Sequence, residues 1–523
     1  MTFPLNIITG LPVAETHFKF KYGFSFLRKP YPEIVFEAPH RLDPGNELPV
    51  LLIIKDADLF PVFLESAEIV IKSPEREIFR KTYSINEKHS SHLHCLCFYA
   101  PVPEDFRGAC SIICCARIKD NKGKKKTIIT DNLPGLSHAP LSCLISEYKR
   151  PVLKNWVVGD AHIHTSRTDD QVEFGLPLKE TAILSKASGL DWFTAADHSY
   201  EFDERSQFNR NTGLYSGLLK EIGEFNRSAT DFSIIPGLEI SCGNIKGRNI
   251  HLLAIDGKYT PGFGDSGHYL FKTSPDLRIE EAVKKSGGIC FAAHPYAETG
   301  LAERFFLNRG RWEDNDFKNE ISGMQFFTGI LDRAFFRGRR KWKELLIRGQ
   351  RSVILAGSDS HGYFNRCRRM NIPFISLKES AFPVTGAAVT FVRSKNNCGE
   401  IINGIKEGRT AVSDGPAASI KVSGTECGGT APSGRHLELS MKVLSTPEFG
   451  PVENISVYRG GNGYEEKLLS INPEKSVYEF EGAFPLEGSG KAGYIRSEAT
   501  TVKHNKKHLC MTGPVYLAKK EKM

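Results

Sequence analysis

Short apolar runs rich in β-branched residues recur along the first 150 residues. Three of them are 49–54, 67–72 and 109–116, and turn signals such as Asp43-Pro44-Gly45-Asn46 lie between the runs. Short strands at this spacing, separated by turns, are typical of two packed antiparallel sheets. We therefore expect an N-terminal β-sandwich-like domain over residues 1–150.

The pattern changes near residue 151, where strand-like apolar runs alternate with segments of helical spacing. The run 191–196 follows a helical pattern over 178–188, and the run 353–356 follows another over 339–348. About seven such strands, mostly separated by helices, predict a parallel, barrel-like α/β domain over 151–415. Strand alternation returns further on and predicts a small C-terminal β-domain over 416–523.

The composition is that of a soluble globular protein with two or three domains. The 523 residues are 40% hydrophobic and 25% charged, and they exceed the length of one ordinary core. The net charge of +8 suits an anionic substrate, but over this length it does not by itself indicate nucleic-acid binding. No apolar run approaches the roughly 20 residues that span a membrane, so we expect no membrane partner.

The first residues and the cysteines both favour a cytoplasmic protein. The N-terminal segment lacks the charged start and sustained apolar run of a signal peptide. The twelve cysteines are scattered without repeated C-x-x-C pairs. Cys95, Cys97, Cys114 and Cys115 lie in strand-like runs, so we interpret them as buried thiols in a reducing compartment rather than as disulfides or a structural zinc site.

The most informative short motif is His162-Ile163-His164, which follows the apolar run 156–158. Because side chains alternate along a strand, both imidazoles would lie on the same side at its end. Two converging imidazoles can begin a metal site. A lone His-x-His motif is equally compatible with ordinary core or surface histidines, so the interpretation depends on the residues further along the chain.

Metal-binding residue types recur at the predicted strand ends of the central region. They are His162, His164, Asp169 or Asp170, His198, Glu239, His251, His294, Asp359 and His361. In an α/β barrel the carboxyl ends of the strands form one face, where side chains from distant segments meet. This number of nitrogen and oxygen ligands exceeds the need of one ion and fits two or three divalent ions, Zn, Mn or Fe, with Glu239 as a bridge. Such a centre is suited to hydrolysis.

These motifs closely resemble the PHP (polymerase and histidinol phosphatase) superfamily. The matching segments are Asp160-Ala-His-Ile-His-Thr165, Thr194-Ala-Ala-Asp-His-Ser199, Pro236-Gly-Leu-Glu-Ile-Ser241, Ala293-His-Pro295 and Gly357-Ser-Asp-Ser-His361. They occur in the family's order and cover roughly 155–415. The upstream β-region and the segment 401–416 resemble the CehA/McbA-type branch of metallohydrolases.

The resemblance implies a distorted (β/α)7, TIM-like barrel that carries a di- or trinuclear centre. One metal would be held by His162, His164, Glu239 and Asp359, a second by Asp169, His198 and His361, and a third by Glu239, His251 and His294. The chain departs from the family at Thr168-Asp169-Asp170-Gln171, where Ser-Asp-Gly is frequent. Spacing favours Asp169 over Asp170 as the ligand.

The leading functional hypothesis is a metal-dependent phosphoesterase that acts on a small phosphorylated molecule. A metal-bridging hydroxide would attack the substrate, Asp359 could shuttle the proton, and His198 or His361 could assist the leaving group. Arg248 and Arg366 are candidates for binding the anionic group, although solvated surface arginines would give the same pattern.

Two alternatives remain open. A carbamate, ester or amide hydrolase would share the multinuclear site but act on a neutral substrate. A non-catalytic protein could instead bind a polymer through its β-domains and keep a vestigial barrel. The sequence argues against a nuclease, because no extended basic groove is visible in it.

Overall fold

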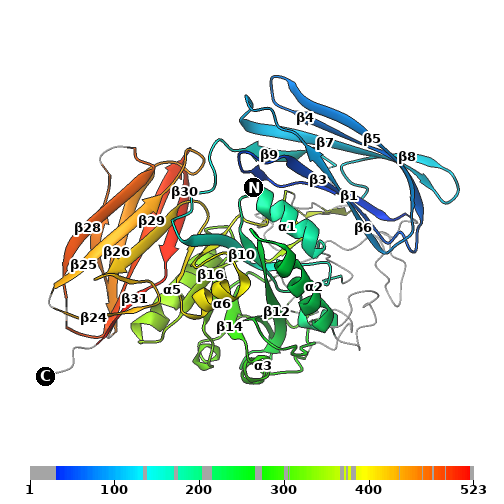
Figure 1. The fold of residues 1–523 in the computed structure, drawn as a ribbon. Coiled ribbons are helices and arrows are strands. Elements are labelled where there is room, and N and C mark those ends of the chain that lie inside the picture. Colours follow the sequence, from blue (N-terminus) through cyan, green and yellow to red (C-terminus); the bar gives the residue numbers. More distant parts are fainter. Residues whose placement is uncertain are drawn as a thin grey trace, which may run out of the picture.

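The structure is a computed structural model of the whole chain, and its β-content dominates. It describes residues 31–133, 138–169, 175–202, 215–265, 274–299, 304, 307–365, 370–372, 375–377, 384–434, 436–461, 463–473, 476–488 and 490–518. The structure is 47% strand and 15% helix. Figure 1 shows two β-rich parts on opposite sides of a central part that carries the helices.

Two sheets form the N-terminal part and enclose one apolar core. The three-stranded sheet has the order β1 (Glu33–Glu37), β3 (Leu48–Lys55), β6 (Leu93–Ala100). The six-stranded sheet contains β2 (Arg41–Leu42), β9 (Leu141–Ile145), β7 (Gly108–Asp120), β4 (Val62–Lys72), β5 (Glu77–His89) and β8 (Lys125–Ile129). Side chains such as Phe36, Leu52, Ile69 and Ile112 from both sheets pack together. Strand β3 is buried on both faces, because its other face packs against the central part.

The central part is built on one long curled sheet. Its strands here are β10 (Trp156–His164), β11 (Trp192–Ala195), β12 (Ser233–Gly243), β13 (Asn249–Ile255), β14 (Ile289–Ala293), β15 (Gly323–Phe327), β16 (Val353–Ala356), β17 (Ser360–His361), β20 (Val389–Arg393) and β21 (Thr410–Ser413). The sheet curls far enough for β17 to pair with β10, where Ile163 lies opposite Ser360 and His164 opposite His361.

The predicted (β/α)7 barrel is wrong, because the strand-helix alternation fails in the middle of the sheet. Strands β12 and β13 are antiparallel neighbours, and β13 is also antiparallel to β14. A short turn from Asn244 to Arg248 joins β12 to β13, and Gly247 adopts a positive φ of 69° in it. That turn replaces a crossover helix. The fold is therefore mostly β, with a large curled sheet instead of a closed ring of parallel strands.

Five α-helices lie within the described residues and pack against this sheet. They are α1 (Leu178–Ala187), α2 (Tyr215–Ser228), α3 (Ile279–Ser286), α5 (Arg333–Ile347) and α6 (Cys398–Lys406), with 3-10 turns η1 (Ser199–Phe202) and η2 (Asp316–Lys318). Local chemistry fixes two helix starts: Asp332 accepts a hydrogen bond from the Phe335 N–H, and Asn397 accepts one from the Glu400 N–H. Each helix contacts a strand of the central sheet: α1 contacts β11, α2 contacts β12, α3 contacts β13, α5 contacts β15 and α6 contacts β20 (Figure 1).

The C-terminal strands continue the same sheet. Strands β24 (Thr430–Pro432), β26 (Val452–Gly461), β27 (Tyr464–Ile471), β29 (Gly493–Lys503), β30 (Lys506–Thr512) and β31 (Val515–Ala518) extend it beyond β21. A second sheet holds β22 (Ala417–Val422), β23 (Thr425–Glu426), β25 (His436–Leu444) and β28 (Glu479–Glu487), and a small hairpin pairs β18 (Met370–Ile372) with β19 (Ile375–Leu377). One apolar core spans the central and C-terminal strands. The three predicted domain ranges remain predictions.

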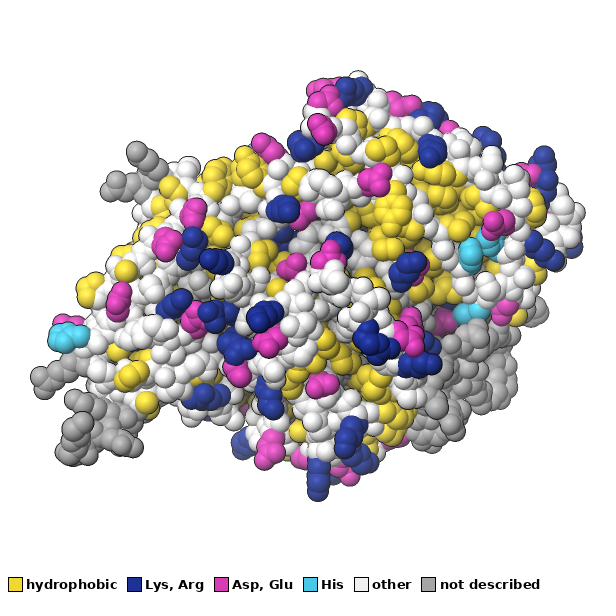
Figure 2. Space-filling view, viewed as in Figure 1, with side chains coloured by type: hydrophobic (Ala, Val, Ile, Leu, Met, Phe, Trp, Pro, Cys, Tyr) yellow, Lys and Arg dark blue, Asp and Glu magenta, His cyan; other side chains and the backbone are white. Residues whose placement is uncertain are grey.

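Three further findings concern membrane-spanning helices, the cysteines and the charges on the surface. Among the described residues, no helix combines the length and apolarity needed to cross a membrane. The described cysteines, including Cys95, Cys97, Cys114 and Cys115, are free thiols. On the face drawn in Figure 2, Lys and Arg side chains are interspersed with Asp and Glu side chains, so neither sign dominates that face.

Candidate metal centre

The backbone around the His-x-His motif is held by a buried carboxylate. Asp160 accepts hydrogen bonds from the N–H groups of His162 (3.1 Å), Ser358 (2.8 Å) and Gly386 (3.1 Å). The Asp359 N–H also donates to the His162 carbonyl at 2.8 Å. Asp160 thereby joins three segments that are distant in sequence and sets the positions of His162 and Asp359 relative to each other.

Glu239 lies at the centre of five histidines. Its Oε2 atom is 3.0 Å from His198 Nδ1, 3.3 Å from His164 Nε2 and 3.6 Å from His162 Nε2, and its Oε1 atom is 2.5 Å from His251 Nδ1 and 2.8 Å from His294 Nε2. The residue has no exposed surface. A fully buried carboxylate with imidazoles on both oxygens has the arrangement of a bridging ligand.

Asp359 supplies a second carboxylate beside the same histidines. Its Oδ1 atom is 3.0 Å from His164 Nε2 and 3.4 Å from His162 Nε2, and its Oδ2 atom is 3.6 Å from His294 Nε2. Unlike Glu239, its side chain is 30% exposed. Its φ of 56° lies in the left-handed region, which Asp tolerates better than most residues and which often marks functional positions.

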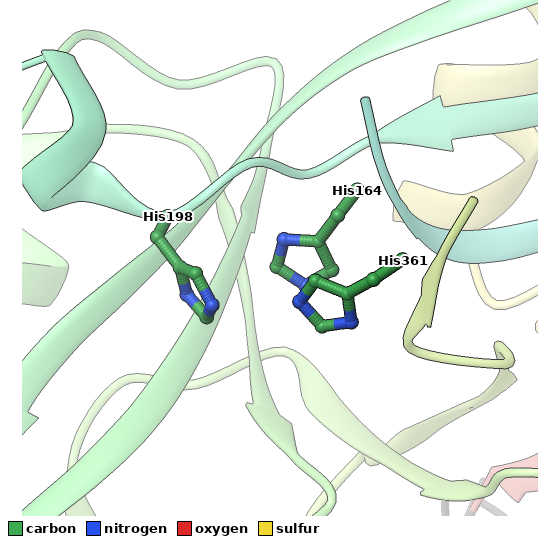
Figure 3. A group of neighbouring side chains, drawn as sticks. All are labelled: His164, His198 and His361. Atoms are coloured by element: carbon green, nitrogen blue, oxygen red, sulfur yellow. The ribbon is translucent and has the colours of Figure 1, made fainter. Parts of the chain in front are cut away.

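Three histidines form a second group next to Glu239. His164 ends β10, His361 lies in β17 and His198 follows β11. The rings of His164 and His361 stack with centroids 3.9 Å apart, and the ring centroids of His164 and His198 are 4.4 Å apart. Figure 3 shows the first two rings overlapping while His198 faces them from the opposite side. One nitrogen of each residue lies within 4.8 Å of the others, close enough to share an ion.

Burial and charge act in opposite directions on these groups. Burial lowers the pKa of His198 to about 3, and the charge of His164 acts in the same direction. Burial also lowers the pKa of His164, but hydrogen bonds to Asp359 and Glu239 outweigh it and raise that pKa to about 9. Burial raises the pKa of Glu239, yet the charges of His251 and His162 hold it well below its usual value. Without a metal, protons therefore lie between the carboxylates and some of the imidazoles of the cluster. A metal cation would replace these protons as the positive charge.

The donor atoms fit divalent metal ions. Among the residues that the structure describes, His162 Nδ1 and Nε2, His198 Nδ1, His251 Nδ1 and Glu239 Oε2 are buried and make no hydrogen bond of good geometry. Buried polar atoms rarely lack partners, because each costs free energy when it is left unsatisfied. Three overlapping sets can hold an ion: His162, His164, Glu239 and Asp359; His164, His198 and His361; and His198, Glu239 and His251. Nitrogen and oxygen donors of this kind suit Zn, Mn or Fe.

The structure brings eight of the predicted residues together and separates the ninth. Asp169 points to the N-terminal part, where its Oδ1 atom is 3.1 Å from Lys55 Nζ and its Oδ2 atom is 2.5 Å from His92 Nε2. Asp170, the alternative ligand, lies outside the described residues. Sequence spacing did not reveal these contacts, because Lys55 and His92 lie more than 70 positions away.

Of the two predicted substrate-binding arginines, the structure describes only Arg248. Arg248 is exposed in the turn between β12 and β13, where its backbone hydrogen-bonds with Asn244. The side chain of Arg366 lies outside the described residues. A cation that sequence reasoning missed is Arg309, whose Nη1 atom is 2.5 Å from His251 Nε2 and 3.0 Å from Asp265 Oδ2.

Two other residues that the sequence analysis did not single out, Asp265 and Gln325, contact histidines of the cluster. Asp265 is buried and its Oδ2 atom is 3.0 Å from His251 Nε2. Gln325 accepts a hydrogen bond from the His294 N–H at 2.9 Å and donates one to the Gly357 carbonyl at 2.8 Å. Asp265 lies in a loop with no sequence signal. Gln325 could have been noticed as the one amide in the apolar run 321–327.

Comparisons with known proteins add little to this description. No protein-family model matches the chain, and neither does any curated protein. Weakly similar solved structures include a putative β-galactosidase from Bacteroides fragilis, a cycloisomaltooligosaccharide glucanotransferase from Paenibacillus sp. and a β-glucuronidase from Parabacteroides merdae. Their identities are 12%, 10% and 11%, and the matches cover 94%, 92% and 94% of this chain and 73%, 70% and 64% of theirs. The TM-scores of 0.19, 0.17 and 0.18 are too low to indicate a shared fold.

Proposed function

We propose that this protein is a metal-dependent hydrolase, and specifically a phosphoesterase that acts on a small anionic substrate. The observation that supports the proposal is Glu239, a buried carboxylate with histidine nitrogens from four separate segments within 3.6 Å of its two oxygens. Burying so many titratable groups together is costly unless they bind something. A bound cation is the partner that matches carboxylate and imidazole donors.

The ions would be held by the residues that already converge. Glu239 would bridge, with His162, His164 and Asp359 on one side and His251 and His294 on the other, and with His198 and His361 next to His164. Divalent ions bound here would polarise a substrate oxygen and lower the pKa of a water molecule.

Asp359 is the group best placed to handle a proton. It contacts His162 and His164, and its side chain is 30% exposed, so a substrate or an attacking water can reach it. Glu239, in contrast, is fully buried. His198 is better suited to being a ligand than an acid, because burial lowers its pKa to about 3 and leaves its imidazole neutral near pH 7. His361 remains the candidate for assisting the leaving group.

An anionic substrate is favoured by Arg309. Its guanidinium pairs with Asp265 at 3.0 Å and lies beside His251, a member of the cluster, while 24% of its side chain remains exposed. A guanidinium can pair with a phosphoryl oxygen through two N–H groups. Arg309 thus replaces Arg248 as the candidate among the described residues for binding the charged group.

A substrate panel tests the proposal directly. The full chain, supplied with Mn²⁺ or Zn²⁺, is assayed on an aryl phosphate monoester, an aryl phosphodiester and an aryl carboxylic ester. We expect metal-dependent release from a phosphate substrate that is lost on adding a chelator. We also expect Arg309→Ala to raise KM for the phosphate substrates, with Arg248→Ala as the matched control. Turnover of the carboxylic ester alone would support a carbamate, ester or amide hydrolase instead, and no turnover of any substrate with metal bound would contradict the proposal.

A further inference from the structure

The N-terminal sheets contact the two loops that follow His164 and His361, two of the three histidines in the second group. One loop follows His164 and includes Thr168 and Asp169, and the other follows His361 and includes Phe364. Thr168 Oγ1 lies 3.1 Å from His164 Nδ1, so the first loop touches a cluster histidine directly. Contacts that hold the first loop therefore bear on the surroundings of His164.

The second loop is tied to the N-terminal part by polar and apolar contacts. The Phe364 carbonyl accepts a hydrogen bond from the His40 N–H at 2.9 Å and lies 3.1 Å from His40 Nδ1. Asn365 Oδ1 accepts another from the Ser142 N–H at 3.0 Å. The Phe364 ring is fully buried in a cluster that includes Leu51 and Ile53 of β3.

The first loop is tied by an ion cluster in which Asp169 is the central anion. Lys55 Nζ lies 3.1 Å from one carboxylate oxygen and His92 Nε2 lies 2.5 Å from the other. The side chains of Lys55, His92 and Asp169 are only 3%, 12% and 13% exposed. His92 Nδ1 faces Asp56 at 3.2 Å, so the charge of the imidazole is balanced on its other side. Both oxygens of Asp169 are thus engaged in a nearly buried, charge-assisted arrangement.

We infer that Asp169 anchors the N-terminal sheets to the metal centre instead of serving as a metal ligand, and that His164, His198 and His361 bind their ion without it. This inference rests on the proposed metal centre. Releasing Asp169 to a metal would remove the carboxylate nearest to both Lys55 and His92. The two nearly buried cations would then share Asp56, at 3.8 Å and 3.2 Å, which is unfavourable. The remaining donors are three imidazole nitrogens and the shared Glu239 carboxylate. Imidazole-rich sites prefer Zn²⁺ over the harder Mn²⁺, so Zn²⁺ is the expected ion for this group.

The inference is tested by counting ions and measuring hydrogen exchange on the full chain. Metal-stripped native protein, Asp169→Asn, Lys55→Met and Asp359→Asn are titrated with Zn²⁺ against a chromogenic chelator. We expect Asp169→Asn and Lys55→Met to bind as many Zn²⁺ ions per chain as the native protein, whereas Asp359→Asn loses one. We also expect amides in 89–94 and 163–169 to exchange about tenfold faster in the first two variants, because a charge-assisted contact is lost.

Asp105→Asn is the matched control, because Asp105 forms an exposed ion pair with Arg76 on the same N-terminal part. This variant should change neither the number of Zn²⁺ ions bound per chain nor the amide exchange rates. Loss of one Zn²⁺ in Asp169→Asn, a gain of one in Lys55→Met, or unchanged exchange in both variants would overturn the inference while leaving the proposed function intact. A native protein that binds no Zn²⁺ or Mn²⁺ would overturn both.

Discussion

The Oδ2 atom of Asp265 lies 3.0 Å from Nε2 of His251, while Nδ1 of the same imidazole faces Glu239 Oε1 at 2.5 Å. The histidine is therefore held between two buried carboxylates, those of Asp265 and Glu239. Because Asp265 accepts the Nε2–H hydrogen bond, Nε2 keeps its proton and Nδ1 is the nitrogen available to a cation. Arg309 Nη1 lies 3.0 Å from the same Asp265 oxygen and donates to that oxygen. Asp265 thereby prepares His251 to bind a cation through Nδ1.

Replacing Asp265 by Asn should weaken metal binding without unfolding the protein. An amide is a weaker acceptor for the imidazole N–H, and loss of such a supporting carboxylate typically costs about 10- to 100-fold in metal affinity. Competition with a chelator would measure the effect. The control is Asp256→Asn, an exposed carboxylate at the end of the same strand β13. Equal affinities in the two variants would show that Asp265 does not orient the ligand.

The Asp160→Asn variant should lose stability. Both oxygens of the Asp160 carboxylate accept backbone N–H groups, and an amide would turn its NH₂ group toward at least one of these donors. Leaving a buried donor unsatisfied costs about 1–3 kcal/mol of unfolding free energy. Urea unfolding measures this loss. A change smaller than about 0.5 kcal/mol would mean that the three segments are held by other contacts.

Stability should fall as the pH drops below neutrality, and His40 should account for part of the loss. Burial, with the charge of Arg150 adding to it, lowers the pKa of His40 to about 4, below the unfolded value of 6.5. The unfolded chain therefore binds more protons between these two values, so stability is lost as the pH falls from 6.5 toward 4. Unfolding at pH 7 and pH 5 should show that His40→Gln removes up to about 2 kcal/mol of this dependence. The same pH dependence in the variant and the native protein would refute the assignment.

The sequence predicted which residues meet, but not the architecture that brings them together. Strand-end histidines and carboxylates can be recognised locally, because an apolar run followed by His, Asp or Glu is visible in the printed sequence. The pairing direction of β12 and β13 is not visible in this way. Both strands are almost entirely buried, and the short turn 244–248 between them makes them antiparallel.

Residues that act across long sequence separations were the ones missed or misassigned. Asp169 has the right spacing for a ligand, yet its carboxylate contacts Lys55 and His92, which belong to a different part of the fold. Arg309 and Asp265 lie in irregular loops, where no periodic pattern indicates direction. Such contacts depend on how loops pack, and a single sequence does not encode that packing in any local pattern.

The central claim is that the buried histidines around Glu239 form a metal centre, and elemental analysis of the purified full chain tests it most directly. Native protein and the double variant His162→Ala/His164→Ala would be loaded with Zn²⁺ or Mn²⁺, dialysed and analysed together, with circular dichroism to check that the variant is folded. We predict at least one tightly bound transition metal per native chain, and a folded double variant that loses metal and metal-dependent hydrolysis. Less than one ion per native chain, or full metal content in the double variant, would contradict the account.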